Sequence, residues 1–80
     1  MLTGAQIRMA RGHLKWSVEK LAREAGLGIS TIQRMESIDG TPTASAKNLQ
    51  AVQRTLEAAG VEFIDQNGGG PGMRLKGRVG

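Results

Sequence analysis

The sequence contains no cysteine, and its only aromatic residues are Trp16 and Phe63. The absence of cysteine excludes disulfide bonds and thiolate metal sites, and it fits the reducing cytoplasm, where we expect the protein to work. Because aromatic residues are so few, aliphatic side chains and four methionines must fill the core. No apolar run approaches the ~18 residues of a membrane span, and Met1–Gly4 lacks the charged and apolar blocks of a secretory signal.

The sequence is also poor in catalytic and metal-binding groups. His13 is the single histidine, and no second ligand stands at metal spacing from it. The carboxylates form no close pair in a pocket-forming context, so no catalytic set can be assembled. We therefore expect no enzyme activity, no metal and no cofactor. The segment Gly68–Gly72 is not a phosphate-binding loop, because no Gly-Lys-Ser or Gly-Lys-Thr follows it.

The length and charge of the chain narrow its class. Eighty residues form at most one domain, and a domain of this size has a small core that dimerisation often supplements. Eleven lysines and arginines stand against seven acidic residues, which gives a net charge of +4. That balance favours an anionic partner such as nucleic acid, although a soluble protein without such a partner can carry the same charge.

Capping signals predict two helices in the first third of the chain. Thr3 and Gln6 have the spacing of a capping box, and apolar residues at helical spacing extend this helix to about Gly12–Lys15. Ser17 is the next N-cap candidate, and Gly26 suits the left-handed residue that ends a helix. The apolar stripe between these two signals consists of Val18, Leu21, Ala22 and Ala25.

A third, short helix fits Ile29–Ser37, and its N-cap has two candidates. Gly28 can fill the cap position, which leaves the side chains of Ser30 and Gln33 free. Alternatively, Ser30 and Gln33 form a capping box of their own, and both are then occupied with the backbone.

The last part of the chain combines a fourth helix with strand patterns. Thr43 can cap the helix, which runs to about Ala59. Val61–Asp65 then suits a strand, and from Met73 onward apolar and basic residues alternate, which predicts a β-hairpin. The alternating residues are Met73, Leu75 and Val79 on one face and Arg74, Lys76 and Arg78 on the other. Because an isolated hairpin is marginal in water, we expect it to pack on the fourth helix or to join a partner's sheet.

Two predicted helices joined by the tight turn Ala25–Gly28 form a helix-turn-helix, in which one helix crosses the DNA backbone and the next enters the major groove. The segment Leu21–Glu36 resembles the helix-turn-helix of the XRE family, which includes phage lambda-type repressors and Cro. The resemblance rests on Leu-Ala-x-x-Ala-Gly at the start of this segment and on Ser-Thr-Ile within it, and it covers most of Thr3–Glu57.

The resemblance implies a compact five-helix domain, and together with the strand pattern at the C-terminal end it predicts a mainly α fold. It consists of a four-helix, lambda repressor-like helix-turn-helix domain over residues 1–60 and a C-terminal β-hairpin over residues 61–80. The sequence departs from the family pattern at two points. Gly28 replaces the usual Ser or Thr cap, so a phosphate contact by that side chain is lost. The strand-like segment replaces the family's fifth helix, as in a subgroup of short bacterial regulators, so the dimer geometry of lambda-type repressors does not carry over.

The resemblance also implies which residues contact DNA. Arg34 suits a bidentate contact to guanine, Gln33 pairs with adenine, and Ile29 touches a thymine methyl group. The full base-reading set is Ile29, Ser30, Gln33 and Arg34. Ser17 and Val18 offer backbone N–H groups to phosphate at the start of the crossing helix. The further phosphate candidates are Thr31, Lys15, Lys20, Thr43 and Lys47.

Plainer interpretations stand beside these assignments. Ile29 also fits a core or staple position, and the lysines also fit solvated surface charges. Trp16 is expected to anchor the core rather than to stack on a base. Glu36 is expected to form a structural salt bridge with Arg8 or Arg11 on the first helix.

The predicted function is that of a sequence-specific double-stranded DNA-binding regulator, a repressor that binds a palindromic operator as a homodimer. The hairpin is the predicted dimerisation element, because an exposed strand edge pairs readily with another chain. The interface residues predicted there are Val61, Phe63, Ile64, Met73, Leu75 and Val79. The alternative is an antitoxin or co-regulator that uses the same scaffold to bind a protein partner. Neither function involves a membrane.

Overall fold

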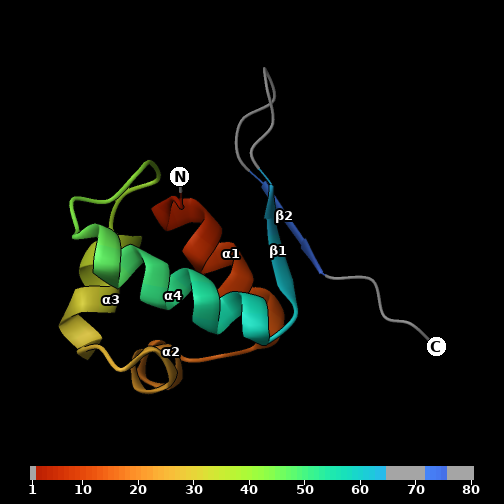
Figure 1. Cartoon of the computed structure of the whole chain (residues 1–80), viewed down its shortest axis with the longest axis horizontal. Coiled ribbons are helices and arrows are strands. Elements are labelled where there is room, and N and C mark those ends of the chain that lie inside the picture. The colour runs from red at the N-terminus through yellow and green to blue at the C-terminus, as the bar shows by residue number, and fades with distance from the viewer. Residues whose placement is uncertain (1, 65–71, 76–80) are drawn as a thin grey trace.

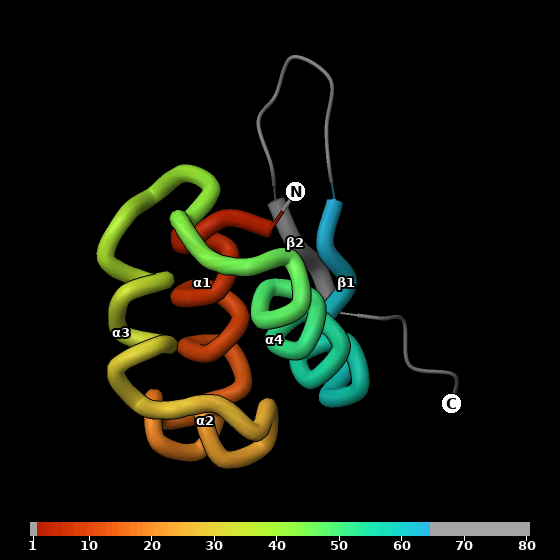
Figure 2. The backbone as a smooth tube through the Cα atoms, turned by 60° about the vertical axis from the view of Figure 1, so that its left-hand side comes forward, coloured from red at the N-terminus to blue at the C-terminus, as the bar shows by residue number. Residues whose placement is uncertain are grey.

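The computed structural model describes residues 2–64 and 72–75. Within these ranges the chain forms four helices and a two-stranded sheet (Figure 1). The elements are α1 (Gly4–Leu14), α2 (Val18–Ala25), α3 (Ile29–Glu36), α4 (Ala46–Ala58), β1 (Val61–Ile64) and β2 (Gly72–Leu75). The sheet packs on α1 and α4, on the side of these helices away from α3 (Figures 1 and 2). The mainly α fold with a C-terminal hairpin is confirmed.

The caps of the first three helices decide where these elements begin. At α1 the capping box is present: the Gln6 backbone N–H donates to Thr3 Oγ1 at 3.1 Å, and the Thr3 N–H donates to Gln6 Oε1 at 2.9 Å. Ser17 caps α2 by accepting the Lys20 N–H at 3.0 Å. Gly28 occupies the N-cap of α3 without a side-chain hydrogen bond, so the competing capping box within α3 is not used.

The fourth helix begins later than the sequence pattern predicted. Its N-cap is Ser45, which accepts the Asn48 N–H at 3.1 Å, and Thr43 lies exposed in the preceding loop. The capping role assigned to Thr43 is therefore wrong. Ala44 explains the shift, because it packs against the core just before the cap while Leu49 is buried one turn into the helix. This is the spacing of a hydrophobic staple.

The core lies where all four helices and β1 meet. Its fully buried side chains come from every one of these elements: Ile7, Ala10, Leu21, Ile32, Met35, Val52, Leu56 and Val61 are at most 1 % exposed. Trp16 is half-buried and packs against this cluster, as expected of a core anchor. With Trp16 and Phe63 at its border, the core consists otherwise of aliphatic side chains and Met35.

The two strands pair within one chain, in an antiparallel ladder that sets Val61 opposite Leu75 and Phe63 opposite Met73. Val61 is fully buried and Phe63 packs against the core. The prediction that Val61 lies in an interface between chains is therefore wrong, because its side chain already closes the core of its own chain. Val79, the last residue of the predicted interface, lies outside the described residues.

The N-terminus of α1 lies against the loop that follows α3. The Gly4 backbone N–H donates to the Gly40 carbonyl oxygen at 2.9 Å, so an N–H without a partner inside the helix is satisfied there. Gly4 has no side chain, and a Cβ atom at this position would overlap the backbone carbonyl oxygens of Met35 and Ile38. Glycine is therefore required for this close approach. Gly12 in the same helix faces open space.

These two glycines of α1 provide a matched pair of variants. We expect Gly4→Ala to lower the free energy of unfolding by about 1–3 kcal/mol, because backbone atoms must move to admit the methyl group. Gly12→Ala is expected to raise it by about 0.5–1 kcal/mol, because alanine loses less entropy in a helix and meets no obstacle. Urea unfolding followed by circular dichroism measures both, and equal effects of the two substitutions would contradict the close approach at Gly4.

Candidate nucleic-acid interface

The turn between α2 and α3 is compact because Gly26 adopts a left-handed conformation, with φ 72°. The Leu27 N–H donates to the Ala22 carbonyl oxygen at 2.9 Å, which closes the end of α2 before the chain reverses. Helix α3 begins at Ile29, three residues after Gly26. The two helices pack directly on each other, so the motif is held as one unit.

Helix α3 has one buried and one exposed side. Ile32 and Met35 are at most 1 % exposed and face the core. All four residues of the predicted base-reading set lie on the exposed side, and Ile29 is 43 % exposed although it is a large apolar residue. The staple or core interpretation of Ile29 is therefore wrong. The exposed side of α3, made of Ile29, Ser30, Gln33 and Arg34, is named the α3 face below.

A bidentate ion pair attaches the C-terminal end of α3 to α1. Arg11 Nε donates to Glu36 Oε2 at 2.9 Å, and Arg11 Nη2 donates to Glu36 Oε1 at 3.0 Å. The remaining Arg11 nitrogen, Nη1, donates to the Trp16 carbonyl oxygen at 3.0 Å. These hydrogen bonds to Glu36 raise the pKa of Arg11 against the opposing effect of burial. One guanidinium group thus connects α1, α3 and the link that leads into α2, and the expected structural role of Glu36 is confirmed.

Arg8 makes a second connection from α1 to the end of α3. It pairs with the Asp39 carboxylate and donates to the Glu36 carbonyl oxygen, so it also satisfies a carbonyl at the C-terminus of α3. The Asp39 side chain is 87 % exposed, whereas that of Glu36 is only 9 % exposed. The ion pair between Arg8 and Asp39 was not predicted, because an aspartate beside a glycine in a loop is typical of a turn. Arg8 and Asp39 are 31 residues apart in the sequence, so no local sequence pattern indicates their contact.

The predicted phosphate-contacting residues are placed unequally. Lys15, Lys47 and the N-cap residue Ser17 are exposed, as is Thr43 in the loop before α4. Val18 and Thr31 are half-buried. The remaining candidate, Lys20, is turned toward its own chain, with its ammonium group 5.1 Å from the centre of the Trp16 ring and 3.8 Å from Glu24 Oε2.

The described residues offer little for other kinds of site. Nowhere in residues 2–64 and 72–75 do three His, Cys, Asp or Glu side chains come together as a metal site would require. Among the described helices, none has the length and apolar character needed to cross a bilayer. One cavity, between α2 and α4, was not predicted, because its lining is dispersed over three segments of the sequence.

Comparison with known proteins adds one finding. The model of a helix-turn-helix family matches residues 7–58, which include most of α1 and all of α2, α3 and α4. No curated protein sequence matches the chain. The matched region contains the α3 face, the turn at Gly26 and both partners of the Arg11–Glu36 pair.

The Arg11–Glu36 pair can be tested against the exposed Arg8–Asp39 pair. We expect Glu36→Gln to lower the free energy of unfolding by about 2 kcal/mol, because the guanidinium loses a carboxylate that is largely shielded from water. Asp39→Asn is expected to cost less than about 0.5 kcal/mol, because its carboxylate is solvated. Urea unfolding of both variants gives the comparison. Equal losses would mean that the shielded pair holds α3 no better than a surface ion pair.

Proposed function

The chain belongs to the XRE family of helix-turn-helix regulators, which bind DNA, and we propose that it is a repressor that binds a palindromic operator as a homodimer. The observation that carries the proposal is the two-sided character of α3: its inner side is buried, and its outer side presents side chains that suit base recognition. A family of DNA-binding regulators is not a family of enzymes.

The α3 face has the chemistry of direct readout in the major groove. The Arg34 guanidinium can donate two hydrogen bonds to guanine O6 and N7, and the Gln33 amide can pair with adenine N6 and N7. Ile29 offers an apolar contact to a thymine methyl group, and its 43 % exposure in the free protein fits such a contact. Ser30 completes the set. Since Gly28 supplies the cap, Ser30 and Gln33 remain available for bases.

Phosphate contacts position this face on the duplex. The N-terminus of α2, at Ser17 and Val18, carries backbone N–H groups that lack partners inside the helix and lie at the positive end of the helix dipole. We assign the supporting contacts to Thr31, Lys15, Thr43 and Lys47. Lys20 can join them only after its ammonium group leaves the Trp16 ring.

We assign the contact between the two protomers to the hairpin. One recognition helix reads too few base pairs to select a site in a genome, so two must be held in register. In the described part of the sheet each strand pairs with one neighbour, and the outer edges offer backbone groups to a second copy. Since Val61 is buried, the proposed interface is reduced to Phe63, Ile64, Met73, Leu75 and Val79.

The base-reading assignment is tested with operators selected from a random DNA pool. We expect Arg34→Ala and Gln33→Ala each to cost about 1–3 kcal/mol of preference for the selected site over random DNA. Lys47→Ala serves as the control, because loss of a phosphate contact weakens binding to all sequences and lowers the salt dependence by about one counterion. Fluorescence anisotropy at several salt concentrations measures both. An Arg34→Ala, Gln33→Ala double variant with full preference would refute the assignment.

The interface assignment is tested with two substitutions that add the same charge. Ile64→Lys places an ammonium group on the partly exposed end of β1, and Gln50→Lys places one on the exposed side of α4. We expect the first to convert a dimer into a monomer in sedimentation at micromolar concentration and to weaken operator binding, and the second to leave the dimer intact. A wild-type chain that sediments as a monomer would rule out this interface.

A further inference from the structure

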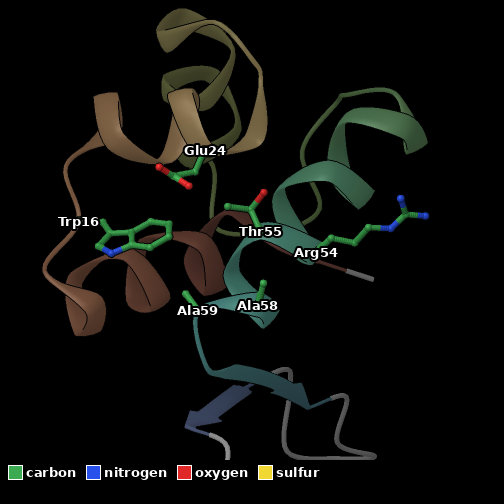
Figure 3. A pocket seen from close by; sticks show the side chains of 6 residues that line it. All are labelled: Trp16, Glu24, Arg54, Thr55, Ala58 and Ala59. Carbon is green, nitrogen blue, oxygen red and sulfur yellow. The ribbon is translucent and has the colours of Figure 1, made fainter.

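A cavity of about 450 Å³ opens between α2 and the last turns of α4 (Figure 3). A volume of this size falls in the range of sites that hold small molecules. We name it the Trp16 pocket, and its lining consists of Trp16, Glu24, Arg54, Thr55, Ala58 and Ala59. None of these residues belongs to the α3 face, so the proposed DNA contact does not use this cavity.

The lining of the Trp16 pocket favours a positive charge next to an apolar group. In Figure 3 the Glu24 carboxylate and the Trp16 ring point toward the same space, whereas the Arg54 guanidinium points away from it. The Thr55 hydroxyl donates to the Ala51 carbonyl oxygen at 2.8 Å, so its lone pairs are left to accept a further hydrogen bond. The methyl groups of Ala58, the last residue of α4, and of its C-cap Ala59 supply the apolar part of the lining.

The chain itself already places a cation next to two residues of this lining, Trp16 and Glu24. The Lys20 ammonium group lies 5.1 Å from the centre of the Trp16 ring, within the range of a cation–π interaction, and 3.8 Å from Glu24 Oε2. The Lys20 and Glu24 side chains are 41 % and 47 % exposed, and ion pairs with that exposure are weak. A ligand that adds apolar contacts can therefore displace this ammonium group.

We propose that the Trp16 pocket binds an organic cation, an ammonium or guanidinium group attached to an apolar body, and that Lys20 occupies the charged end of the site in the free protein. The cation lies against the Trp16 ring and donates hydrogen bonds to the Glu24 carboxylate, which is its counterion. The apolar body lies against Ala58 and Ala59.

The fluorescence of Trp16 reports binding directly, because the chain has no other tryptophan and no tyrosine. We expect benzylammonium and benzamidinium to change this fluorescence with saturation, and neutral benzyl alcohol to leave it unchanged at equal concentration. Glu24→Gln should weaken binding of both cations roughly tenfold, because the charged hydrogen-bond acceptor is lost. A response to benzyl alcohol equal to that of benzylammonium, or unchanged affinity in Glu24→Gln, would overturn the proposal.

The role of Lys20 is tested with a charge-matched control. Lys20→Met removes the internal competitor and is expected to tighten binding of benzylammonium several-fold. Lys47→Met removes the same charge elsewhere on the surface and is expected to change it little. Circular dichroism checks that each variant is folded. Equal effects of the two substitutions would show that Lys20 does not occupy the site.

The cation can come from a free amine or from a lysine side chain of a protein. Nα-acetyl-lysine amide and its Nζ-acetylated form distinguish these sources in the same titration. Tighter binding of the charged lysine derivative than of benzylammonium supports a protein side chain, and the reverse order supports a small amine. A derivative that binds equally with and without its ammonium charge counts against the site.

One consequence rests on the proposed function. When a cation displaces Lys20 from the ring, the Lys20 ammonium group is released next to the N-terminus of α2, where a phosphate is proposed to bind. Benzylammonium should then raise operator affinity several-fold in the wild-type chain and not in Lys20→Met. An equal effect in both chains would refute this coupling. A chain that gives the fluorescence response but binds no DNA would contradict the proposed function and leave the pocket assignment intact.

Discussion

The Arg11 guanidinium is the group on which the placement of the helix-turn-helix depends. Its hydrogen bonds to both Glu36 oxygens and to the Trp16 carbonyl fix α1, the end of α3 and the entry into α2 relative to one another. A planar group with five N–H donors can serve three partners at once, which a lysine ammonium cannot do with the same geometry. The orientation of α3 is thereby set from its C-terminal end, while its N-terminal end is set by the turn at Gly26.

This polar attachment follows from the demands on α3. A helix of eight residues that must leave one side exposed has few side chains left for the core, and α3 buries only Ile32 and Met35. Burial of two side chains gives a limited contribution, on the order of 1.5–3 kcal/mol each. The ion pairs from Arg8 and Arg11 add directional contacts at the helix end without covering the α3 face. The exposed side of α3 can therefore remain rich in polar groups while the helix stays in place.

The parts of the fold that sequence reasoning recovered are those with local signals. The capping box of Thr3 with Gln6, the Ser17 cap and the left-handed Gly26 each act within a few residues, and all three were predicted. The start of α4 was misplaced because two hydroxyl residues compete there, and packing of Ala44 selects Ser45. The burial of Val61 was missed because a short apolar strand reads the same whether it faces its own core or a partner.

The residues of the candidate site also differ in whether the sequence could predict them. The resemblance to the XRE family identified the exposed α3 residues, and helical spacing sets them on the side opposite Ile32 and Met35. Gly4 and Asp39 could not be identified from the sequence, because their importance arises from contacts between segments more than thirty residues apart. The position of Lys20 was also unpredictable, since a lysine one turn from a tryptophan fits a solvated charge equally well.

The contacts of α1 with the loop after α3 also determine when α1 can fold during synthesis of the chain. Helix α1 leaves the ribosome before α3. The carbonyl that accepts its Gly4 N–H and the carboxylates that pair with its arginines belong to residues 36–40. At about 5–20 residues per second, these partners follow within seconds. An isolated helix of eleven residues is marginal in water. The nascent α1 segment therefore stays largely unfolded until α3 has been made, and both become ordered together.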